Sequence, residues 1–436
     1  MKQTIFHPSF KARPFWWEAY EPQPLPQVTL PREVEVAIVG GGYAGMNAAL
    51  ELARNGVQSL VLDAAEPGYG GSTRSGGLVS AGVNVGKRII NRALTPEEAK
   101  PFLNDAVDAF THIEDLITTN GVDCGWHKTG YFLGAWCKSH YESMAKKVDL
   151  LNAEAQSGAR IIPREAQRQH IGSDYYQGGM LVARAAHLHP ALYYKGLLGL
   201  VQKAGVDTAS GTPVMGLSQN NDSTWQVKTS RGTLKARHVV IATNGYTGDV
   251  TPQFKRRLVP VGSYIIATEE LAPDVIAAIS PQNHSFADTR RVLTYYRLSP
   301  DGKRMIFGGR AKFGFSDPVE TAPMLHRFMT DRFPQLREAK ITHAWTGNVA
   351  FTLDEMPHTG QMDGLHYALG CNGSGVAMMS YLGRETARRI IGKSNRRIAF
   401  DTGDFPKSAL YGGNPWFLPL VGAYFRAADW WDRRFH

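Results

Sequence analysis

The sequence contains little cysteine and no long apolar run. Three cysteines, Cys124, Cys137 and Cys371, occur in 436 residues, and none belongs to a C-x-x-C pair. Their number and spacing argue against a disulfide framework and a zinc site, and they are typical of a reducing compartment. No stretch reaches the roughly 18 apolar residues that a membrane-spanning helix needs. Residues 1–33 lack the apolar core of a secretory signal peptide, so we expect a cytoplasmic protein without a bound metal.

Acidic residues are the scarcer charge class, with 39 against 48 basic ones, which gives a formal net charge of +9. A basic surface can favour anionic ligands, nucleic acid or a membrane face. Because no dense block of Lys and Arg is present, solubility alone is the simpler interpretation. The length of 436 residues, with 43% hydrophobic and 20% charged, predicts a globular protein with two or three cores.

A glycine turn stands in VEVAIVGGGYAGMNAALELARNGVQSLVLDA, residues 34–64, between a predicted strand and a predicted helix. Gly40, Gly42 and Gly45 form G-x-G-x-x-G. The first allows a tight turn, the second brings backbone close to a pyrophosphate, and the third lets helix pack on strand. Asp63 ends the next strand, where a carboxylate can accept hydrogen bonds from a ribose. This context predicts dinucleotide binding.

The rest of the chain favours FAD over a nicotinamide cofactor. No second G-x-G-x-x-G marks a separate nicotinamide domain. The loop EPGYGGSTRSGGLVSAG supplies glycines and hydroxyls for further phosphate and ribitol groups, and GCNGSGVAMM begins a later helix. Two alternatives stay open on these residues: a nicotinamide-dependent dehydrogenase, and a non-catalytic basic binding protein, for which no nucleic-acid motif is present.

Four further motifs follow in order: HLHPALYYKGL, HVVIATNGYT, MIFGGR and WTGNVAFTLDEMPHTG. Together with the glycine motifs they resemble the D-amino-acid oxidase/glycine oxidase (DAO) family of FAD-dependent amine oxidoreductases, most of all its γ-glutamylputrescine oxidoreductase branch. The resemblance covers roughly residues 34–395. The loop departs from that branch, because it has S-T-R-S-G-G where S-G-R-N-G-G is common.

The resemblance implies an α/β (α+β two-domain) fold, with a Rossmann-like FAD-binding domain and a discontinuous, mainly antiparallel β-sheet substrate domain, of the glutathione-reductase-2-like type. Helices are predicted over 96–120, where Thr95-Pro96-Glu97-Glu98 forms a good N-terminal cap, and over 139–157. The expected division is an N-terminal extended arm (1–33), an FAD-binding domain (34–115 with 180–250 and 340–400), a substrate domain (116–179 with 251–339) and a C-terminal tail (401–436).

The resemblance also implies which residues bind FAD. They are Gly40, Gly42, Tyr43, Ala44, Gly45, Asp63, Ala64, Gly71, Ser72, Thr73, Arg74, Gly76, Gly77, Leu78, Val214, Thr243, Asn244, Gly245, Gly373, Ser374, Gly375, Val376 and Ala377. Monomeric sarcosine oxidases link FAD to a cysteine just before a T-x-x-D-E-like stretch. Here that neighbourhood is Gly347-Asn348-Val349-Ala350, and Cys371 lies in a different turn. We therefore expect non-covalent FAD.

By this resemblance, the reaction takes a hydride from the carbon beside an amine to flavin N5, and the imine then hydrolyses. The expected substrate is a small amine or amino acid carrying a carboxylate, such as a γ-glutamyl-polyamine, pipecolate or sarcosine, with O2 or another electron acceptor. A helix N-terminus around Gly373, Ser374 and Gly375 would stabilise negative charge on the reduced ring. A neutral amine can release hydride directly, so no proton-transfer residue is assigned, and we expect His358 and His366 to be structural.

Arg74, Tyr264, Tyr296 and Asn348 are the candidate catalytic residues. The Arg74 guanidinium suits a planar anion, either the flavin edge or a substrate carboxylate, and a structural ion pair is the alternative. The other three lie on segments that resemble those on the substrate side of the flavin, as does Arg297. Strand residues alternate between faces, so Tyr296 and its neighbour Tyr295 cannot both point into one pocket.

The C-terminal segment FPKSALYGGNPWFLPLVGAYFRAADWWDRRFH is rich in aromatics and arginines. Such a segment could lie on a membrane surface as an interfacial helix. Pro415 and Pro419, with the acids Asp429 and Asp432, instead favour a tail that packs back over the cofactor domain.

Overall fold

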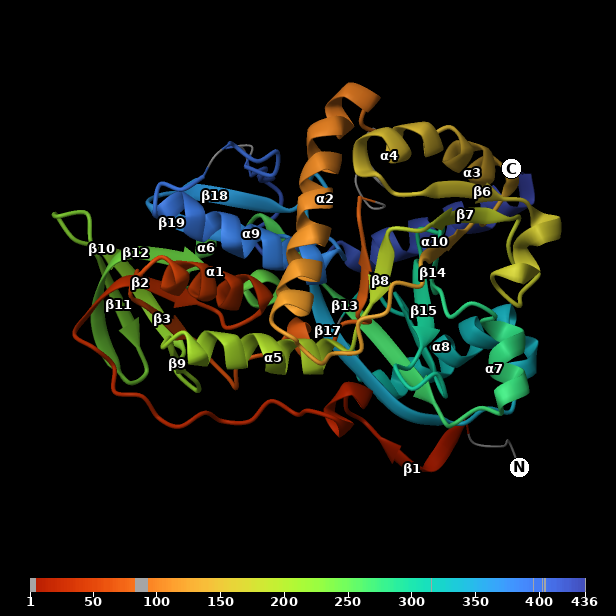
Figure 1. Ribbon diagram of the computed structural model, residues 1–436, viewed down its shortest axis with the longest axis horizontal. Helices are drawn as coiled ribbons and strands as arrows, with labels where there is room; N and C mark the ends of the chain where they lie inside the picture. The colour runs from red at the N-terminus through yellow and green to blue at the C-terminus, as the bar shows by residue number, and fades with distance from the viewer. Residues whose placement is uncertain are drawn as a thin grey trace.

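The computed structural model describes residues 5–82, 93–314, 316–394, 396–401, 403 and 405–435. Figure 1 shows two sheets side by side, with α2 (Pro96–Thr119) standing between them. Within the described residues, no helix has both the length and the apolar character needed to cross a bilayer. One sheet contains most of the predicted cofactor-binding strands, and the other contains most of the predicted substrate-domain strands.

The first sheet is built on a parallel core. β2 pairs in parallel with β12 and β3, β3 with β9, and β12 with β19. An antiparallel β10–β11–β12 meander and the β18–β19 hairpin complete it. Its eight strands are β2 (Glu33–Val39), β3 (Ser59–Leu62), β9 (Asp207–Ala209), β10 (Val214–Gln219), β11 (Trp225–Thr229), β12 (Gly232–Ile241), β18 (His358–Met362) and β19 (Leu365–Leu369).

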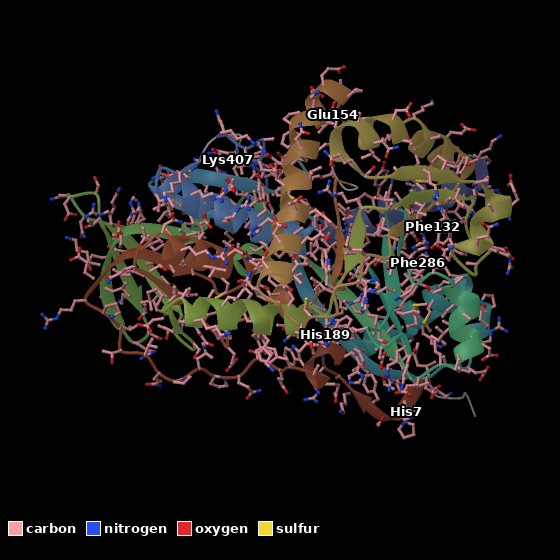
Figure 2. All side chains as sticks on the ribbon, in the orientation of Figure 1. His7, Phe132, Glu154, His189, Phe286 and Lys407 are labelled. Atoms are coloured by element: carbon pink, nitrogen blue, oxygen red, sulfur yellow. The ribbon has the colours of Figure 1, made fainter. Side chains whose placement is uncertain are left out.

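The second sheet is mainly antiparallel, as predicted, with parallel pairs only at β1–β17 and β14–β5 among the described pairings. Phe132 on β5 lies opposite Phe286 on β14, and Figure 2 shows the two rings in the middle of this layer. In spatial order its nine strands are β1 (Phe6–Lys11), β17 (Ile341–Thr352), β13 (Leu258–Thr268), β16 (Met305–Gly309), β15 (Thr294–Leu298), β14 (Ser285–Asp288), β5 (Tyr131–Gly134), β7 (Gly179–Val182) and β6 (Ala159–Ile162).

Helices cover both sheets. The apolar sides of α1, α2, α5 and α9 share one core beside the parallel strands, and α8 packs on β13 and β17. Besides α2 they are α1 (Tyr43–Arg54), α3 (Lys138–Ala145), α4 (Val148–Ala155), α5 (Pro190–Lys203), α6 (Pro252–Lys255), α7 (Pro273–Ile279), α8 (Pro318–Arg332), α9 (Gly375–Ile390) and α10 (Leu418–Phe435). A small pair, β4 (Leu78–Ser80) with β8 (Ala185–His187), and the 3-10 turns η1 (Phe15–Glu18), η2 (Gly71–Thr73), η3 (Arg164–Gln169), η4 (Asn244–Tyr246) and η5 (Pro334–Leu336) complete the chain.

Local capping explains where α2 begins. Thr95 accepts a hydrogen bond from the Glu98 N–H at 3.3 Å, and the Glu98 carboxylate accepts one from the Thr95 N–H at 2.9 Å. The N-terminal cap predicted at Thr95-Pro96-Glu97-Glu98 is thus a reciprocal capping box, which stabilises the first turn. The single helix predicted over 139–157 is instead two, α3 and α4, separated by Lys146 and Lys147.

Three segments differ from the expected division. β17, which the division placed with the cofactor domain, pairs with β13 in the second sheet. The N-terminal arm contributes β1 to the second sheet, and its Trp16 is completely buried. α10 packs on the second sheet, through Asp429 and Phe425, and not over the cofactor domain as expected. In each case, contacts between segments that are distant in the sequence decide the packing, and the order of the segments along the chain does not show these contacts.

Candidate functional site

The three motif glycines between β2 and α1 have different surroundings. Gly40 has a φ of 105°, which favours glycine, and a Cβ there would lie 2.8 Å from the Ala242 carbonyl oxygen. A Cβ on Gly45 would lie 1.9 Å from the Gly40 oxygen, so Gly45 lets α1 pack on the turn. Gly42 precedes α1, and a Cβ there would face Ser72 Oγ at 3.1 Å. Gly40 and Gly42 line a cavity, and Gly45 supports the turn from behind.

Asp63 follows β3 at the same end of the cavity. Its Oδ2 accepts a hydrogen bond from the Gly41 N–H at 2.7 Å, and its Oδ1 accepts one from the Ala65 N–H at 3.0 Å. Burial raises the pKa of Asp63, while these two N–H groups act to lower it. Ala64 and Val214 line the cavity beside it. A carboxylate held in this way keeps further lone pairs for a ligand hydroxyl.

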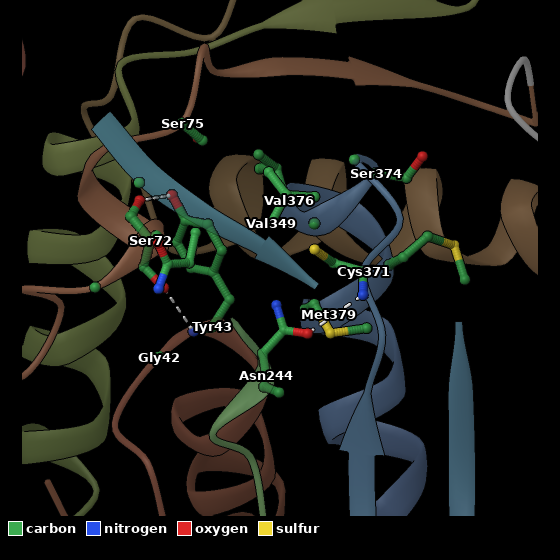
Figure 3. Close-up of a pocket in the computed structure, with 18 of the residues that line it drawn as sticks. Gly42, Tyr43, Ser72, Ser75, Asn244, Val349, Cys371, Ser374, Val376 and Met379 are labelled. Atoms are coloured by element: carbon green, nitrogen blue, oxygen red, sulfur yellow. Dashed lines mark hydrogen bonds between the residues drawn. The ribbon is translucent and has the colours of Figure 1, made fainter. Parts of the chain in front are cut away.

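The loop after β3 is fastened to the start of α1. The Tyr43 N–H donates to Ser72 Oγ at 3.1 Å, and the Tyr43 hydroxyl donates to the Ser72 carbonyl at 2.5 Å (Figure 3). Thr73 is fully buried, where its hydroxyl accepts from the Trp17 indole at 3.0 Å and donates to the Gly68 carbonyl at 2.8 Å. Ser72 therefore lines the cavity, and Thr73 holds the loop to the N-terminal arm.

Arg74 lines the cavity, but its guanidinium already has partners in the protein. Its Nε donates to the Tyr69 carbonyl at 2.8 Å, and its Nη1 donates to the Thr346 carbonyl at 3.2 Å. The same group lies 4.6 Å from the Trp17 ring centre and 4.5 Å from that of Tyr69. These contacts tie the glycine-rich loop to β17 and to the arm.

Arg297 has a comparable position on the other side of this loop. It is fully buried, its Nε donates to the Gly76 carbonyl at 2.8 Å, and its Nη2 donates to the Leu188 carbonyl at 2.6 Å. Burial lowers the pKa of Arg297 to about 9. It fixes the backbone of the loop and does not line the cavity.

The turn between β19 and α9 closes the opposite wall. Gly373 has a φ of 84°, and a Cβ there would meet no protein atom within 4 Å. Asn244 fixes the start of the turn, because its Oδ1 accepts from the N–H groups of Gly370 at 3.0 Å and Cys371 at 3.3 Å. Figure 3 shows the hydrogen bond between Asn244 and Cys371 as a dashed line. The residues that follow, Ser374, Gly375, Val376 and Ala377, all line the cavity.

Two helix N-termini therefore open on one cavity of about 730 Å³. A Cβ on Gly383 of α9 would lie 2.1 Å from the Ala44 carbonyl oxygen of α1, so the two helices are in close contact. The first N–H groups of a helix have no partner within it, and that end carries the positive end of the helix dipole. The cavity wall can bind an anionic group at both places.

At the other end, Tyr295 forms one wall. Its hydroxyl lies 2.8 Å from Ser263 Oγ, and burial raises its pKa to about 12. A Cβ on Gly76 would lie 2.8 Å from its ring, and a Cβ on Gly308 would lie 2.4 Å from it. The Tyr295 ring thus occupies the space that these two glycines leave.

Tyr296 and Tyr264 point elsewhere. The Tyr296 hydroxyl lies 2.8 Å from that of Tyr176 in the core of the second sheet. Tyr264 donates to the Gly314 carbonyl at 2.5 Å and accepts from the Ser316 N–H at 2.9 Å. Alternation along β15 places Tyr295, rather than Tyr296, at the cavity. Tyr264 and Tyr296 were predicted as catalytic residues, but neither lines the cavity, and both make hydrogen bonds within the protein.

Asn348 does line the cavity. Its Nδ2 donates to the Gly245 carbonyl at 3.2 Å, and a Cβ on Gly245 would lie 2.9 Å from the Asn348 Cβ. Gly245 therefore makes room for Asn348. The two histidines lie outside the lining: His358 pairs with Asp354 at 3.0 Å, and His366 lies 3.4 Å from the ring of His238.

Most predicted site residues come together in this cavity. Those that line it are Gly40, Gly42, Tyr43, Ala44, Asp63, Ala64, Gly71, Ser72, Arg74, Gly76, Gly77, Leu78, Val214, Thr243, Asn244, Asn348, Gly373, Ser374, Gly375, Val376 and Ala377. Within the described ranges, those that lie outside the lining are Gly45, Thr73, Gly245, Tyr264 and Tyr296.

Sequence reasoning missed Arg310. It follows β16, lines the cavity, and its guanidinium lies 4.6 Å from the Phe351 ring centre. Its Nη1 donates to the Arg291 carbonyl at 3.4 Å. Burial lowers its pKa to about 10, opposed by the charge of Glu355, which also lines the cavity. The motif MIFGGR contained the clue, because a charged residue ends a fully apolar strand.

The cavity has the features that a flavin dinucleotide requires: bare backbone at Gly40 and Gly42, a carboxylate at Asp63, and a second helix N-terminus. The family model for FAD-dependent oxidoreductases (DAO) matches residues 35–389. A probable oxidoreductase, OrdL, of Haemophilus influenzae is 31% identical over 402 residues, which is 89% of this chain and 90% of that protein. The γ-glutamylputrescine oxidoreductase of Escherichia coli is 28% identical, over 91% of this chain and 92% of that one.

Solved structures have the same fold. The glycine oxidase of Geobacillus kaustophilus superposes with a TM-score of 0.72 at 18% identity, covering 87% of this chain and 99% of that chain. The L-proline dehydrogenase of P. horikoshii gives a TM-score of 0.70 at 18% identity, covering 85% and 96%. The family decides between the cofactors left open by the sequence, in favour of FAD. The chain belongs to the DAO family and is an FAD-dependent oxidoreductase.

Proposed function

We propose that this enzyme oxidises the C–N bond of a small amine or amino acid that carries a carboxylate. The named activities of the relatives support an amine: one oxidises γ-glutamylputrescine and another is a glycine oxidase. The single observation that carries the carboxylate is Arg310, a half-buried guanidinium on the cavity wall that donates to a backbone carbonyl and lies near the charge of Glu355. A guanidinium suits a carboxylate because it offers two parallel N–H donors.

The residues that hold FAD divide between the two helix N-termini. Gly40, Gly42 and Ser72 would surround the pyrophosphate, and Asp63 would accept from the ribose hydroxyls. When bound, FAD supplies the acceptor for a hydride from the carbon beside the amine. The N–H groups at the start of α9, around Gly375, present a positive dipole end to negative charge in the cavity. We propose that FAD is bound without a covalent link.

The substrate end combines one charge with apolar walls. Arg310 would bind the carboxylate and so fix the distance of the amine from the wall formed by Tyr295. Phe351 and Val261 exclude water on the same side, which strengthens the ion pair. The amine must be neutral to release hydride, and no cavity-lining group is assigned to take its proton. O2 or another acceptor then reoxidises the enzyme.

A substrate panel tests this function. The purified protein should be yellow, and anaerobic bleaching of the flavin should be followed with pairs of amines that are identical except for a carboxylate. Bleaching by the carboxylate members at a much higher kcat/KM than by their partners supports the proposal. If both members of a pair bleach the flavin at equal rates, the role of the carboxylate is contradicted. If neither member of any pair bleaches it, amine oxidation is contradicted. The same assay with O2 admitted, or with a dye acceptor, shows which acceptor is used.

A further inference from the structure

Helix α10 docks on the second sheet by one face. Gly422 faces the Phe313 ring so closely that a Cβ there would lie 2.6 Å from it, and the Phe425 ring centre lies 5.6 Å from that of Phe313. The same apolar cluster includes Val261 and Phe351, which line the cavity. The docked face of α10 therefore lies one layer outside the substrate end. In Figure 1 the C-terminus lies beside α3 and β6.

Both acids of the helix point inward. The Asp429 carboxylate accepts from the N–H groups of Arg291 at 2.9 Å and Val292 at 3.0 Å, and it is nearly fully buried. Asp432 pairs with the Arg291 guanidinium at 2.5 Å. These two carboxylates are the acids of residues 409–435. In the sequence, these two acids argued against a helix that lies on a membrane. In the structure both carboxylates pair with Arg291 on the docked face, so neither lies on the opposite face of the helix.

The opposite face of α10 is apolar and open to solvent. Leu420, Tyr424, Trp431 and Phe435 follow one another at spacings of four, seven and four, which places them on one side of a helix. Trp430 on α10 and Trp416, which precedes the helix, are exposed as well, and the six side chains are between 53% and 68% exposed. We name Trp416, Leu420, Tyr424, Trp430, Trp431 and Phe435 the aromatic face. Apolar side chains gathered in this way mark a binding surface rather than scattered exposure.

Two exposed arginines of α10 lie beside the aromatic face. Arg426 and Arg434 are exposed, and the Arg434 guanidinium lies 5.5 Å from the Trp430 ring centre. Aromatic residues with arginines at their edge are the composition of helices that lie in the headgroup region of an anionic bilayer. We propose that the aromatic face of α10 binds a membrane surface that contains anionic lipids, with the helix lying in the plane of the interface.

A second copy of the chain fits this face less well. A two-fold contact would place the same patch on both sides. Arg426 and Arg434 would then approach their own copies, and the two carboxylates of α10 within its described residues, Asp429 and Asp432, are already paired with Arg291. Anionic phosphates complement these charges, and the indole and phenol rings suit the boundary between headgroups and acyl chains.

Vesicle flotation tests the proposal with the full-length, FAD-loaded protein. Vesicles of phosphatidylcholine alone are compared with vesicles of equal parts phosphatidylcholine and phosphatidylglycerol. The wild-type protein should float with the anionic vesicles, and high salt should reduce its binding. The triple variant Leu420→Ser, Tyr424→Ser, Trp431→Ser should bind at least about tenfold less, since three apolar anchors are removed. Met215→Ser, which removes a 59% exposed residue of β10, should bind as the wild type does.

A second variant separates charge from apolar contact. Arg426→Glu with Arg434→Glu should abolish the preference for anionic vesicles while flavin content stays normal, which keeps the test valid should the triple variant fold poorly. Absence of wild-type binding to anionic vesicles overturns the proposal. So does a wild-type dimer, seen by light scattering, that the triple variant converts to a monomer, because the face would then join two copies. These outcomes are independent of the proposed reaction.

Discussion

Replacing Arg310 by methionine tests how the cavity recognises its substrate. Methionine keeps an unbranched apolar stem against Phe351 and removes the guanidinium. Glu355 lies on the same cavity wall and its charge acts on Arg310, so thermal unfolding and flavin content of the variant are measured beside the kinetics. We expect normal folding and flavin content, and a loss confined to substrates with a carboxylate.

The magnitude follows from the burial of the charge. Two opposite charges about 4 Å apart at an effective dielectric constant of about 20 attract by about 4 kcal/mol. Because about 1.4 kcal/mol is tenfold, kcat/KM for a carboxylate substrate should fall about a thousandfold in Arg310→Met. An otherwise identical amine without the carboxylate should change by less than about threefold, since it never made the ion pair.

The pH dependence has a defined direction. Burial lowers the pKa of Arg310 to about 10, so the free enzyme carries the positive charge below that pH and loses it as the pH rises through it. The preference for the carboxylate substrate, measured as a ratio of kcat/KM values, should therefore decline above about pH 10. Taking the ratio to the uncharged partner cancels the titration of the amine itself. Arg310→Met should show no such decline.

The assay is anaerobic flavin bleaching with matched substrates, and Arg337→Met, which replaces an exposed arginine that follows η5 and does not line the cavity, serves as the control. If Arg310→Met slows both members of a pair equally, the residue is structural and the carboxylate role is refuted. If Arg74→Met is instead the variant that loses the preference, the anchor is Arg74, and its contacts with Tyr69 and Thr346 must open on binding.

Three further outcomes are expected. Gly42→Val should be folded but hold less than about a tenth of the normal flavin, because a side chain would occupy the space where the phosphates approach. The control Gly199→Ala, where a Cβ meets nothing within 4 Å, should keep its flavin. Full flavin in Gly42→Val contradicts the proposed phosphate site at this turn. Tyr296→Phe should lower the free energy of unfolding by about 1 kcal/mol and leave kcat/KM unchanged, whereas Tyr295→Phe should lower kcat/KM about fivefold. Both variants are compared by denaturant unfolding and by steady-state kinetics. A loss of kcat/KM in Tyr296→Phe and none in Tyr295→Phe would show that Tyr296, not Tyr295, acts in the site. Acid precipitation should release all the flavin, and colour that stays with the wild-type pellet but leaves that of Cys371→Ser would reveal a covalent link.

The parts of the fold that the sequence predicted depend on local chemistry. Gly40 and Asp63 were found because a turn with positive φ and a carboxylate at a strand end each restrict the residue type. The capping box at Thr95 was found for the same reason. The start of α9 was found through Gly373, where a positive φ favours glycine. In these cases one short segment contains the whole explanation.

The parts that could not be predicted depend on pairing between distant segments. Tyr295 and Tyr296 are equally plausible on a strand, since alternation gives the period but not which residue faces the cavity. β15 must pair with β16 before the choice is made. Arg310 follows the apolar strand β16, but only the packing of β16 shows that its guanidinium lies on the cavity wall. Trp16 and Trp17 lie in an irregular arm, yet their indoles donate to Ser75 and Thr73.

The Tyr295 ring shows why the cofactor and substrate segments alternate along the chain. It lies between Gly76, on the loop that would wrap FAD, and Gly308, on the neighbouring strand of the second sheet. Arg297, two residues on, donates to the Gly76 carbonyl from the same strand. Arg297 of β15 thus fixes the backbone of the loop that contains Gly76, and the missing side chain at Gly76 leaves space for the Tyr295 ring. A cofactor domain cut from this chain would lose the support of that loop, so the two sheets form one binding unit although each has its own core.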